Sequence, residues 1–294
     1  MARRISASQL RSKLRQAQQK RRQAISKVNS AIRKFNSTQK RAVVDRNRKA
    51  RARNARARAN QQRVKQELRR LNSRLPTTTT RFSTLRVSVQ TVHDAYGCYE
   101  EQVGADTDHP LHAELLDLAE REDANSLGVM NALLDDDTDT HASSGALQET
   151  SIVDELLSIS SDLDQRWRGA VFALNPTNPD ACRHFCSSAR EVFTKMVHLK
   201  TPDAEVLRAL PSCEVTDRGR PTRRSRIQFV LGEKGMNTES LEEFVERDIT
   251  NILELFDVLN SGTHGDAGKY SLPKLVAIKT RVEQGLLFLA RVIS

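Results

Sequence analysis

The chain has 294 residues, with 47 Lys and Arg against 37 Asp and Glu, and its formal net charge is +10. No apolar run approaches the roughly 20 residues that a membrane-spanning helix needs, and no apolar segment follows the basic N-terminus as in a signal peptide. The four cysteines form no CxxC pair. We therefore expect a cytoplasmic protein with reduced thiols and no membrane span.

Charge is distributed very unevenly along the chain. Residues 1–75 hold 25 basic and 2 acidic side chains, whereas residues 76–165 hold 3 basic and 19 acidic side chains. Residues 166–294 are nearly balanced, with 19 basic and 16 acidic side chains. These shifts predict a basic helical arm, an acidic helical region and a C-terminal helical domain with those boundaries. Because alternating apolar runs are few, the predicted fold class is all-α.

Residues 5–74 predict one long helix, because they are rich in Ala, Arg, Gln and Lys and contain no Gly or Pro. Apolar residues recur there mostly at steps of 3, 4 and 7, which is the pattern of a coiled coil and predicts a homo-oligomer. The stretch RNRKARARNARARAN (46–60) has almost no large apolar side chain. Its cations predict binding to a nucleic-acid backbone; the alternative is packing against the acidic region of the same chain. The predicted binding residues here are Arg46, Arg48, Lys49, Arg51, Arg53, Arg56 and Arg58.

The acidic region predicts three helices. In the first, Arg86 and His93 lie seven residues apart and therefore share a face, which makes them an alternative catalytic pair. The acidic run at 135–139 lacks the central Gly and the final Glu of a calcium-binding loop. We therefore predict a solvated loop there, with no metal site and no cofactor.

Two features of residues 166–294 suggest phosphate chemistry. The first is the cluster of Arg223, Arg224 and Arg226, whose guanidinium groups suit phosphate oxygens; the alternative is a solvated turn before a helix. The second is His264 in LNSGTHGDAGKYS (259–271), a glycine-marked junction between two predicted helices. Asn260 would share its face if the helix continued, and histidine suits acid–base catalysis near neutral pH. The alternative is a helix C-cap with a structural histidine.

RWRGAVFALNPTNPDACRHFCSSAREVFTKMV (166–197) and LPSCEVTDRGRPTRRSRIQFVL (210–231) resemble the bacterial family of predicted pPIWI-associating nucleases, which is linked to prokaryotic defence. The NSGTHG element also resembles the HEPN-type motif of abortive-infection ribonucleases, an Arg and a polar residue followed by a His. In that comparison His264 takes the histidine position and Asn260 the polar position, but Leu259 stands where the arginine belongs. The missing cation would have to come from Lys269, Arg281, Arg190 or the Arg223–Arg226 cluster.

The resemblance implies a nucleic-acid-binding defence protein and a metal-independent ribonuclease. In it, His264 would take a proton from an RNA 2′-hydroxyl or give one to the leaving oxygen, and Asn260 would orient the histidine or the phosphate. Expected partners are RNA for cleavage, RNA or DNA for binding, a second copy of the chain, and a protein of the defence system. The alternative is a non-catalytic scaffold that binds nucleic acid or oligomerises. A metal-dependent DNA nuclease would have to draw on scattered acids, namely Glu191, Glu242, Glu243 and Asp248.

Overall fold

The computed structural model describes residues 7–73, 82–105, 110–135, 145–175, 177–236, 238–261 and 270–293. Helices dominate these residues and no strand occurs among them beyond one isolated bridge, so the all-α prediction is confirmed. The first six helices are α1 (Ala7–Ser73), α2 (Ser83–Ala105), α3 (Pro110–Leu134), α4 (Gly145–Gln148), α5 (Val153–Ile159) and α6 (Ser161–Ala173). The remaining helices are α7 (Ala181–Lys200), α8 (Asp203–Ala209), α9 (Arg223–Glu233), α10 (Glu239–Ser261) and α11 (Leu272–Ile293).

The chain divides into two units, residues 1–56 and residues 57–294. The first unit is the N-terminal part of α1, whose side chains are exposed wherever they are described. Its large apolar side chains include Leu14, Ile25, Val28, Ile32 and Phe35, each at least half exposed. The described side chains of this unit therefore form no hydrophobic core of their own. The helical structure of the unit comes from the helix propensity of its residues.

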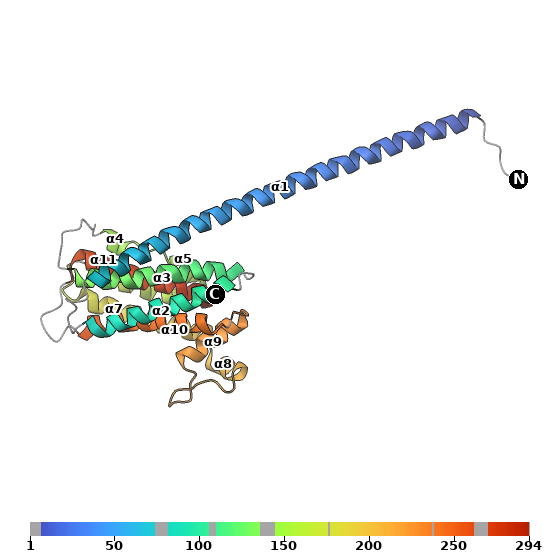
Figure 1. Ribbon diagram of the computed structural model, residues 1–294. Coiled ribbons are helices and arrows are strands. Elements are labelled where there is room, and N and C mark those ends of the chain that lie inside the picture. Colours follow the sequence, from blue (N-terminus) through green and yellow to red (C-terminus); the bar gives the residue numbers. More distant parts are fainter. Residues whose placement is uncertain are drawn as a thin grey trace. The chain divides into compact units, whose positions relative to one another are not determined.

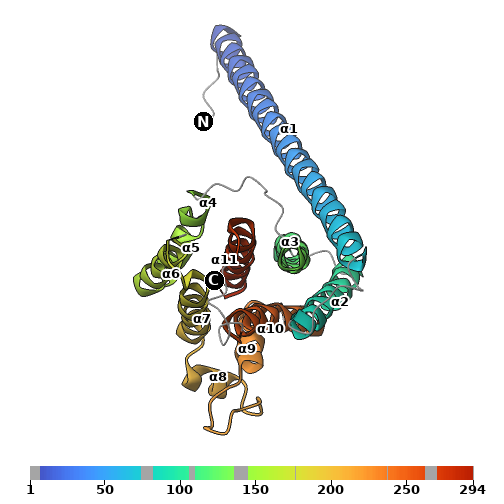
Figure 2. The ribbon, with the colours of Figure 1, turned by 90° about the vertical axis from the view of Figure 1, so that its left-hand side faces the viewer.

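The second unit is a helical bundle with one continuous hydrophobic core. Helix α2 packs along α10, α3 along α11, and α6 along α7, while α11 lies between α3 and the group α5 to α7 (Figures 1 and 2). Aromatic contacts join three helices of the core: Tyr99 of α2 stacks on Phe244 of α10, and Phe244 meets Phe288 of α11 edge-on. The predicted segments 76–165 and 166–294 both contribute side chains to this core.

Within the second unit, the last turns of α1 are anchored by polar contacts to α3. Asn131 donates to the carboxylate of Glu67 at 2.7 Å, and Arg70 pairs with Asp135. Val64 and Leu71 are buried beside these contacts. This part of the basic segment therefore packs on the acidic region, as the intramolecular alternative expects, whereas residues 7–56 form a separate unit.

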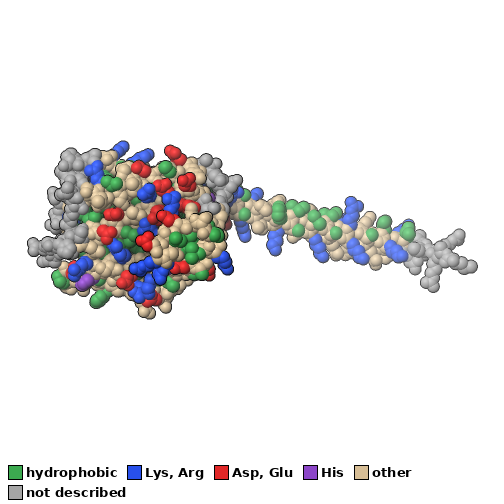
Figure 3. Space-filling model, turned by 90° about the horizontal axis from the view of Figure 1, so that it is seen from below, with side chains coloured by type: hydrophobic (Ala, Val, Ile, Leu, Met, Phe, Trp, Pro, Cys, Tyr) green, Lys and Arg blue, Asp and Glu red, His purple; other side chains and the backbone are tan. Residues whose placement is uncertain are grey.

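The surface of the second unit carries both signs of charge. Figure 3 shows Lys and Arg interspersed with Asp and Glu over the face that it presents. Several of these charges pair locally, such as Arg166 with Asp162 and Glu191. Among the described helices, none is long and apolar enough to cross a membrane.

Candidate active site

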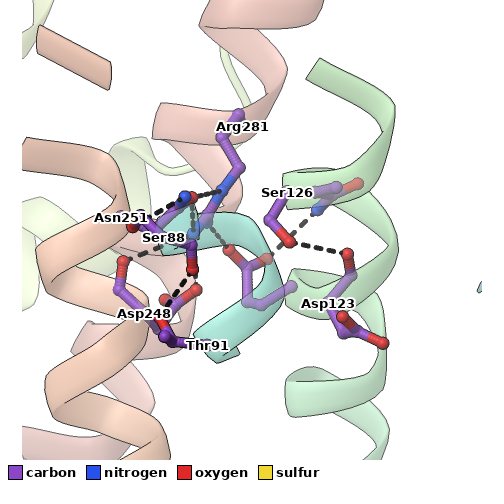
Figure 4. A network of polar contacts seen from close by, with 9 residues as sticks. Ser88, Thr91, Asp123, Ser126, Asp248, Asn251 and Arg281 are labelled. Carbon is purple, nitrogen blue, oxygen red and sulfur yellow. Dashed lines mark hydrogen bonds and ion pairs between the residues drawn. The ribbon is translucent and has the colours of Figure 1, made fainter. Parts of the chain in front are cut away.

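A buried arginine joins three helices at the centre of the second unit. The guanidinium of Arg281 on α11 is fully buried and donates to the carboxylates of Glu122 on α3 and Asp248 on α10. It also donates to the side-chain oxygen of Asn251, at 3.3 Å from Nε and 3.1 Å from Nη2 (Figure 4). A guanidinium is a planar group with five donors, and here its partners surround it. Arg281 therefore takes the central cationic position between two buried acids.

The close approach of α11 to its neighbours depends on Gly285, one turn after Arg281. A Cβ atom at Gly285 would lie 2.3 Å from Cδ1 of Ile252, 3.3 Å from Nη1 of Arg281 and 3.4 Å from Oε2 of Glu122. The first distance is far inside van der Waals contact. The glycine thus makes room for the arginine and its carboxylate partner.

Next to this cluster, an aspartate holds a histidine at the edge of the core. Nδ1 of His93 on α2 lies 2.9 Å from the carboxylate of Asp123 on α3. The Asp123 side chain is fully buried, whereas His93 keeps 27% of its side-chain surface exposed. Because one ring nitrogen faces the carboxylate, Nε2 is the nitrogen left for an outside group. This is the arrangement by which proteins orient an acid–base histidine.

Further hydrogen bonds fix the helices that carry these two groups. Asn251 donates to the hydroxyl of Ser88 at 3.2 Å, which links α10 to α2 (Figure 4). Ser126 donates to the backbone carbonyl of Asp123 at 2.8 Å, and Asn125 donates to Glu122 at 3.1 Å. Glu122 and Asp123 are neighbours on α3, so one helix turn supplies the acid that contacts Arg281 and the acid that contacts His93.

The acids and bases of this cluster have shifted pKa values. Burial raises the pKa of Glu122 to about 8, although the nearby Arg281 opposes the shift. Burial also raises the pKa of Asp248, and the hydrogen bond to Asp123 raises the pKa of His93 above its ordinary value. Perturbed titratable groups gathered in this way are typical of functional sites.

The structure leaves the predicted catalytic motif largely outside its description. His264 and Lys269 both lie outside the described residues. Asn260 is in the last turn of α10, where it is partly buried. The structure thus describes the alternative histidine of α2, His93, and not the one in the NSGTHG element.

The predicted binding residues fall into two groups. On α1 they are exposed, namely Arg46, Arg48, Lys49, Arg51, Arg53, Arg56 and Arg58. In the arginine cluster, Arg224 is exposed, but Arg223 donates to Glu246 at 2.7 Å. Arg226 is buried and donates to Asp203 and to the carbonyl of Thr201. Two of the three clustered guanidinium groups therefore have protein partners.

The sequence pattern indicates Asp248 only as one of several scattered acids, and it gives no sign that Glu122 contacts Arg281 or that Asp123 holds His93. The stretch EREDANS (120–126) lies in an acidic predicted helix, yet Glu120, Glu122, Asp123, Asn125 and Ser126 are all buried. A polar run between apolar stretches of one helix is a signal of such a cluster. Among the described residues, no group of three or more His, Cys, Asp or Glu side chains is arranged to hold a metal ion.

Residues 156–289 match the family described as predicted pPIWI-associating nuclease. This match confirms the family resemblance of the sequence over residues 156–289, and it supports the class of nuclease. The segment contains Asp248, Asn251 and Arg281, whereas His93 and Asp123 precede it. Comparison with curated proteins gives no match, and comparison with solved structures gives none either.

Proposed function

We propose that this protein is a defence-type nuclease that cleaves RNA without a metal ion, with His93 as its acid–base residue. The Asp123–His93 pair carries the proposal: a partly exposed histidine is oriented by a fully buried carboxylate. The match to a family of predicted nucleases supports the reaction class. We place the protein in the prokaryotic cytoplasm, next to a partner protein of its defence system.

In the proposed reaction, neutral His93 removes the proton of an RNA 2′-hydroxyl through Nε2. The 2′-oxygen attacks the adjacent phosphorus, the bond to the 5′-oxygen breaks, and the leaving oxygen takes up a proton from a water molecule. Asp123 stabilises the imidazolium that forms, since it accepts the Nδ1 hydrogen bond. Arg86, two helical turns earlier on the same helix, is the cation nearest in sequence that shares this face, and we assign it to the phosphate.

Residues 7–56 would bring the nucleic acid to the protein. Each Lys or Arg that neutralises a phosphate releases condensed counterions, so an exposed basic helix binds backbones of any sequence with a strong dependence on salt. The described side chains of this unit are exposed, and the stretch 46–56 is its densest in arginine. This binding serves RNA and DNA alike, whereas cleavage requires the 2′-hydroxyl of RNA.

The test is cleavage of labelled single-stranded RNA, structured RNA and DNA of the same sequence, with EDTA present. We compare the wild type with His93→Gln, with His264→Ala and with His184→Gln, an exposed histidine of α7 as matched control. We expect RNA cleavage that falls about 100-fold or more in His93→Gln, the range of general acid–base catalysis, and persists in both other variants. If only His264→Ala lost RNA cleavage, catalysis would instead be assigned to His264 in the NSGTHG element, with Asn260.

A non-catalytic scaffold is the second candidate. The observation in its favour is the exposed apolar series on α1, where Ile25, Val28, Ile32 and Phe35 follow steps of 3, 4 and 3. That spacing suits a coiled-coil seam with a second copy of the chain. Binding of RNA without cleavage, together with a mass above that of a monomer in light scattering, would support this candidate.

A further inference from the structure

A separate cavity of about 260 Å³ lies between α7, α9 and α10, beside the turn that leads into α9. Its apolar wall is formed by Phe193, Val197, Ile249 and Leu253. Its polar side is formed by His198, Arg223 and Arg226, with hydroxyl groups from Thr194, Thr216 and Thr222. The cavity is thus apolar on one side and lined on the other by two guanidinium groups, each of which is paired with a carboxylate. Its volume is below the roughly 300–1,000 Å³ of sites for drug-sized ligands, so it suits a smaller molecule or one unit of a chain.

Both arginines of the cavity are held in place by protein acids. Arg226, which is 3% exposed, donates its Nη atoms to Asp203 and Thr201, and Arg223 donates Nε and Nη2 to Glu246. Among the described residues, no hydrogen bond is made by Nη1 of Arg223 or by Nε of Arg226. Each guanidinium is therefore held in a fixed orientation beside the cavity. Oriented guanidinium groups recognise phosphate well, because little side-chain freedom remains to be lost.

One further feature of the polar side favours an anion, and a second adds a neutral hydrogen-bonding group. Helix α9 begins at Arg223, and Thr222 caps it by accepting a hydrogen bond from the backbone of Ser225. Its own first turn contains no acidic residue, although the carboxylate of Glu214 lies 3.4 Å from the hydroxyl of the capping Thr222. His198 adds a ring that stays neutral more readily than usual, because burial and Arg226 lower its pKa. A neutral imidazole beside the threonine hydroxyls can bond to the polar edge of a ligand.

We propose that this cavity binds a nucleoside monophosphate, with the base against the apolar wall and the phosphate at Arg223 and Arg226. A flat base suits Phe193 and its aliphatic neighbours, while the two guanidinium groups match phosphate oxygens. The occupant is either a free nucleotide or the 5′-phosphorylated terminal nucleotide of a strand. The cavity shares no residue with the Asp123–His93 pair, so the inference stands independently of the proposed cleavage.

The first test is isothermal titration calorimetry of the full chain with AMP, adenosine and inorganic phosphate. We expect AMP to bind at least about tenfold more tightly than adenosine or phosphate, because a charge-assisted hydrogen bond contributes about one order of magnitude in affinity. Equal affinities for AMP and adenosine would overturn the assignment of the arginines. Absence of AMP binding at millimolar concentration, together with absence of binding by a 5′-phosphorylated strand, would overturn the site itself.

Three variants separate the cavity from general surface attraction. Arg223→Gln should weaken AMP binding about tenfold, since it removes the proposed phosphate donor. Glu246→Gln keeps the cation of Arg223 and an amide oxygen that can still orient it, so it should weaken AMP binding less than Arg223→Gln does. Arg224→Gln removes an exposed neighbouring charge, so it should bind AMP like the wild type. Equal weakening in Arg223→Gln and Arg224→Gln would overturn the proposal.

An oligodeoxynucleotide with and without a 5′-phosphate identifies the source of the ligand. DNA lacks the 2′-hydroxyl that the proposed cleavage requires, so binding is measured without reaction. A 5′-phosphate that raises affinity in the wild type but not in Arg223→Gln assigns the cavity to strand ends. AMP binding without such an effect assigns it to free nucleotides. Either outcome supports the site, and neither one bears on whether His93 cleaves RNA.

Discussion

Gly285→Ala tests whether the close packing around Arg281 governs the stability of the bundle. The added methyl group would lie 2.3 Å from Cδ1 of Ile252, although carbon atoms prefer about 3.5–4.0 Å. Ile252 is fully buried, so its side chain has little room to turn away. The methyl group would also press on Nη1 of Arg281 and on Oε2 of Glu122, at 3.3 Å and 3.4 Å. We therefore expect α11 to shift away from α3 and α10.

The size of the effect is the balance of two opposing contributions. Overpacking in a dense core costs about 1–3 kcal/mol, whereas Ala in place of Gly within a helix stabilises by about 0.5–1 kcal/mol. The net prediction for Gly285→Ala is a loss of up to about 2.5 kcal/mol in the free energy of unfolding. Urea denaturation measures this as a lower transition midpoint with an unchanged slope.

Gly169→Ala is the matched control for this substitution. Gly169 is an exposed position within α6, and a Cβ atom there would meet no other atom within 4 Å. The same chemical change should therefore stabilise the protein by up to about 1 kcal/mol. The packing argument is refuted if Gly285→Ala is as stable as the wild type, or more stable, while Gly169→Ala gains stability.

Three further predictions concern the buried charges and the basic arm. Arg281→Met leaves Glu122 and Asp248 buried without their cation, so we expect a loss of about 3–5 kcal/mol in urea denaturation; a loss below about 1 kcal/mol would contradict this. The pKa of Glu122, about 8, lies above its ordinary value of 4.5, so the folded state binds the proton more tightly and stability falls as pH rises from 4.5 to 8. In Glu122→Gln, the free energy of unfolding should fall less steeply with pH, by at most about 1.4 kcal/mol per pH unit. If the urea midpoints of the variant and the wild type change equally between pH 5 and pH 9, this prediction is wrong. Deleting residues 1–56 should make nucleic-acid affinity weaker and much less dependent on salt, and an unaltered salt slope in fluorescence anisotropy would show that the arm does not bind.

The helices follow from local sequence. The long α1 is predicted because no Gly or Pro interrupts its helix formers, and it runs from Ala7 to Ser73 in the structure against a predicted 5–74. The start of α9 at Arg223 follows from Pro221 and the capping Thr222. Periodicity and capping are properties of neighbouring residues, so a single sequence reveals them.

The candidate site follows from tertiary packing, and sequence reasoning recovered only parts of it. His93 was a secondary candidate because its spacing from Arg86 puts both on one face, but nothing local shows that Asp123 holds it. Arg281 and Asp248 are 33 residues apart in sequence, and Glu122 is 159 residues from Arg281. Only the packing of α3 and α10 against α11 brings these charges together. Likewise, only packing turns Arg226 from a surface cation into a buried one.

The cleavage rate of single-stranded RNA in EDTA, measured against pH for the wild type and Asp123→Asn, tests the central claim most directly. Asp123 raises the pKa of His93 through their hydrogen bond, and the base must be neutral to act, so the wild-type rate should rise with pH through a pKa above 6.5. In Asp123→Asn, that rise should move to lower pH and the maximal rate should fall, because the imidazolium loses its carboxylate. Superimposable pH profiles for the two proteins would contradict the account, since the buried acid would then play no part in the reaction.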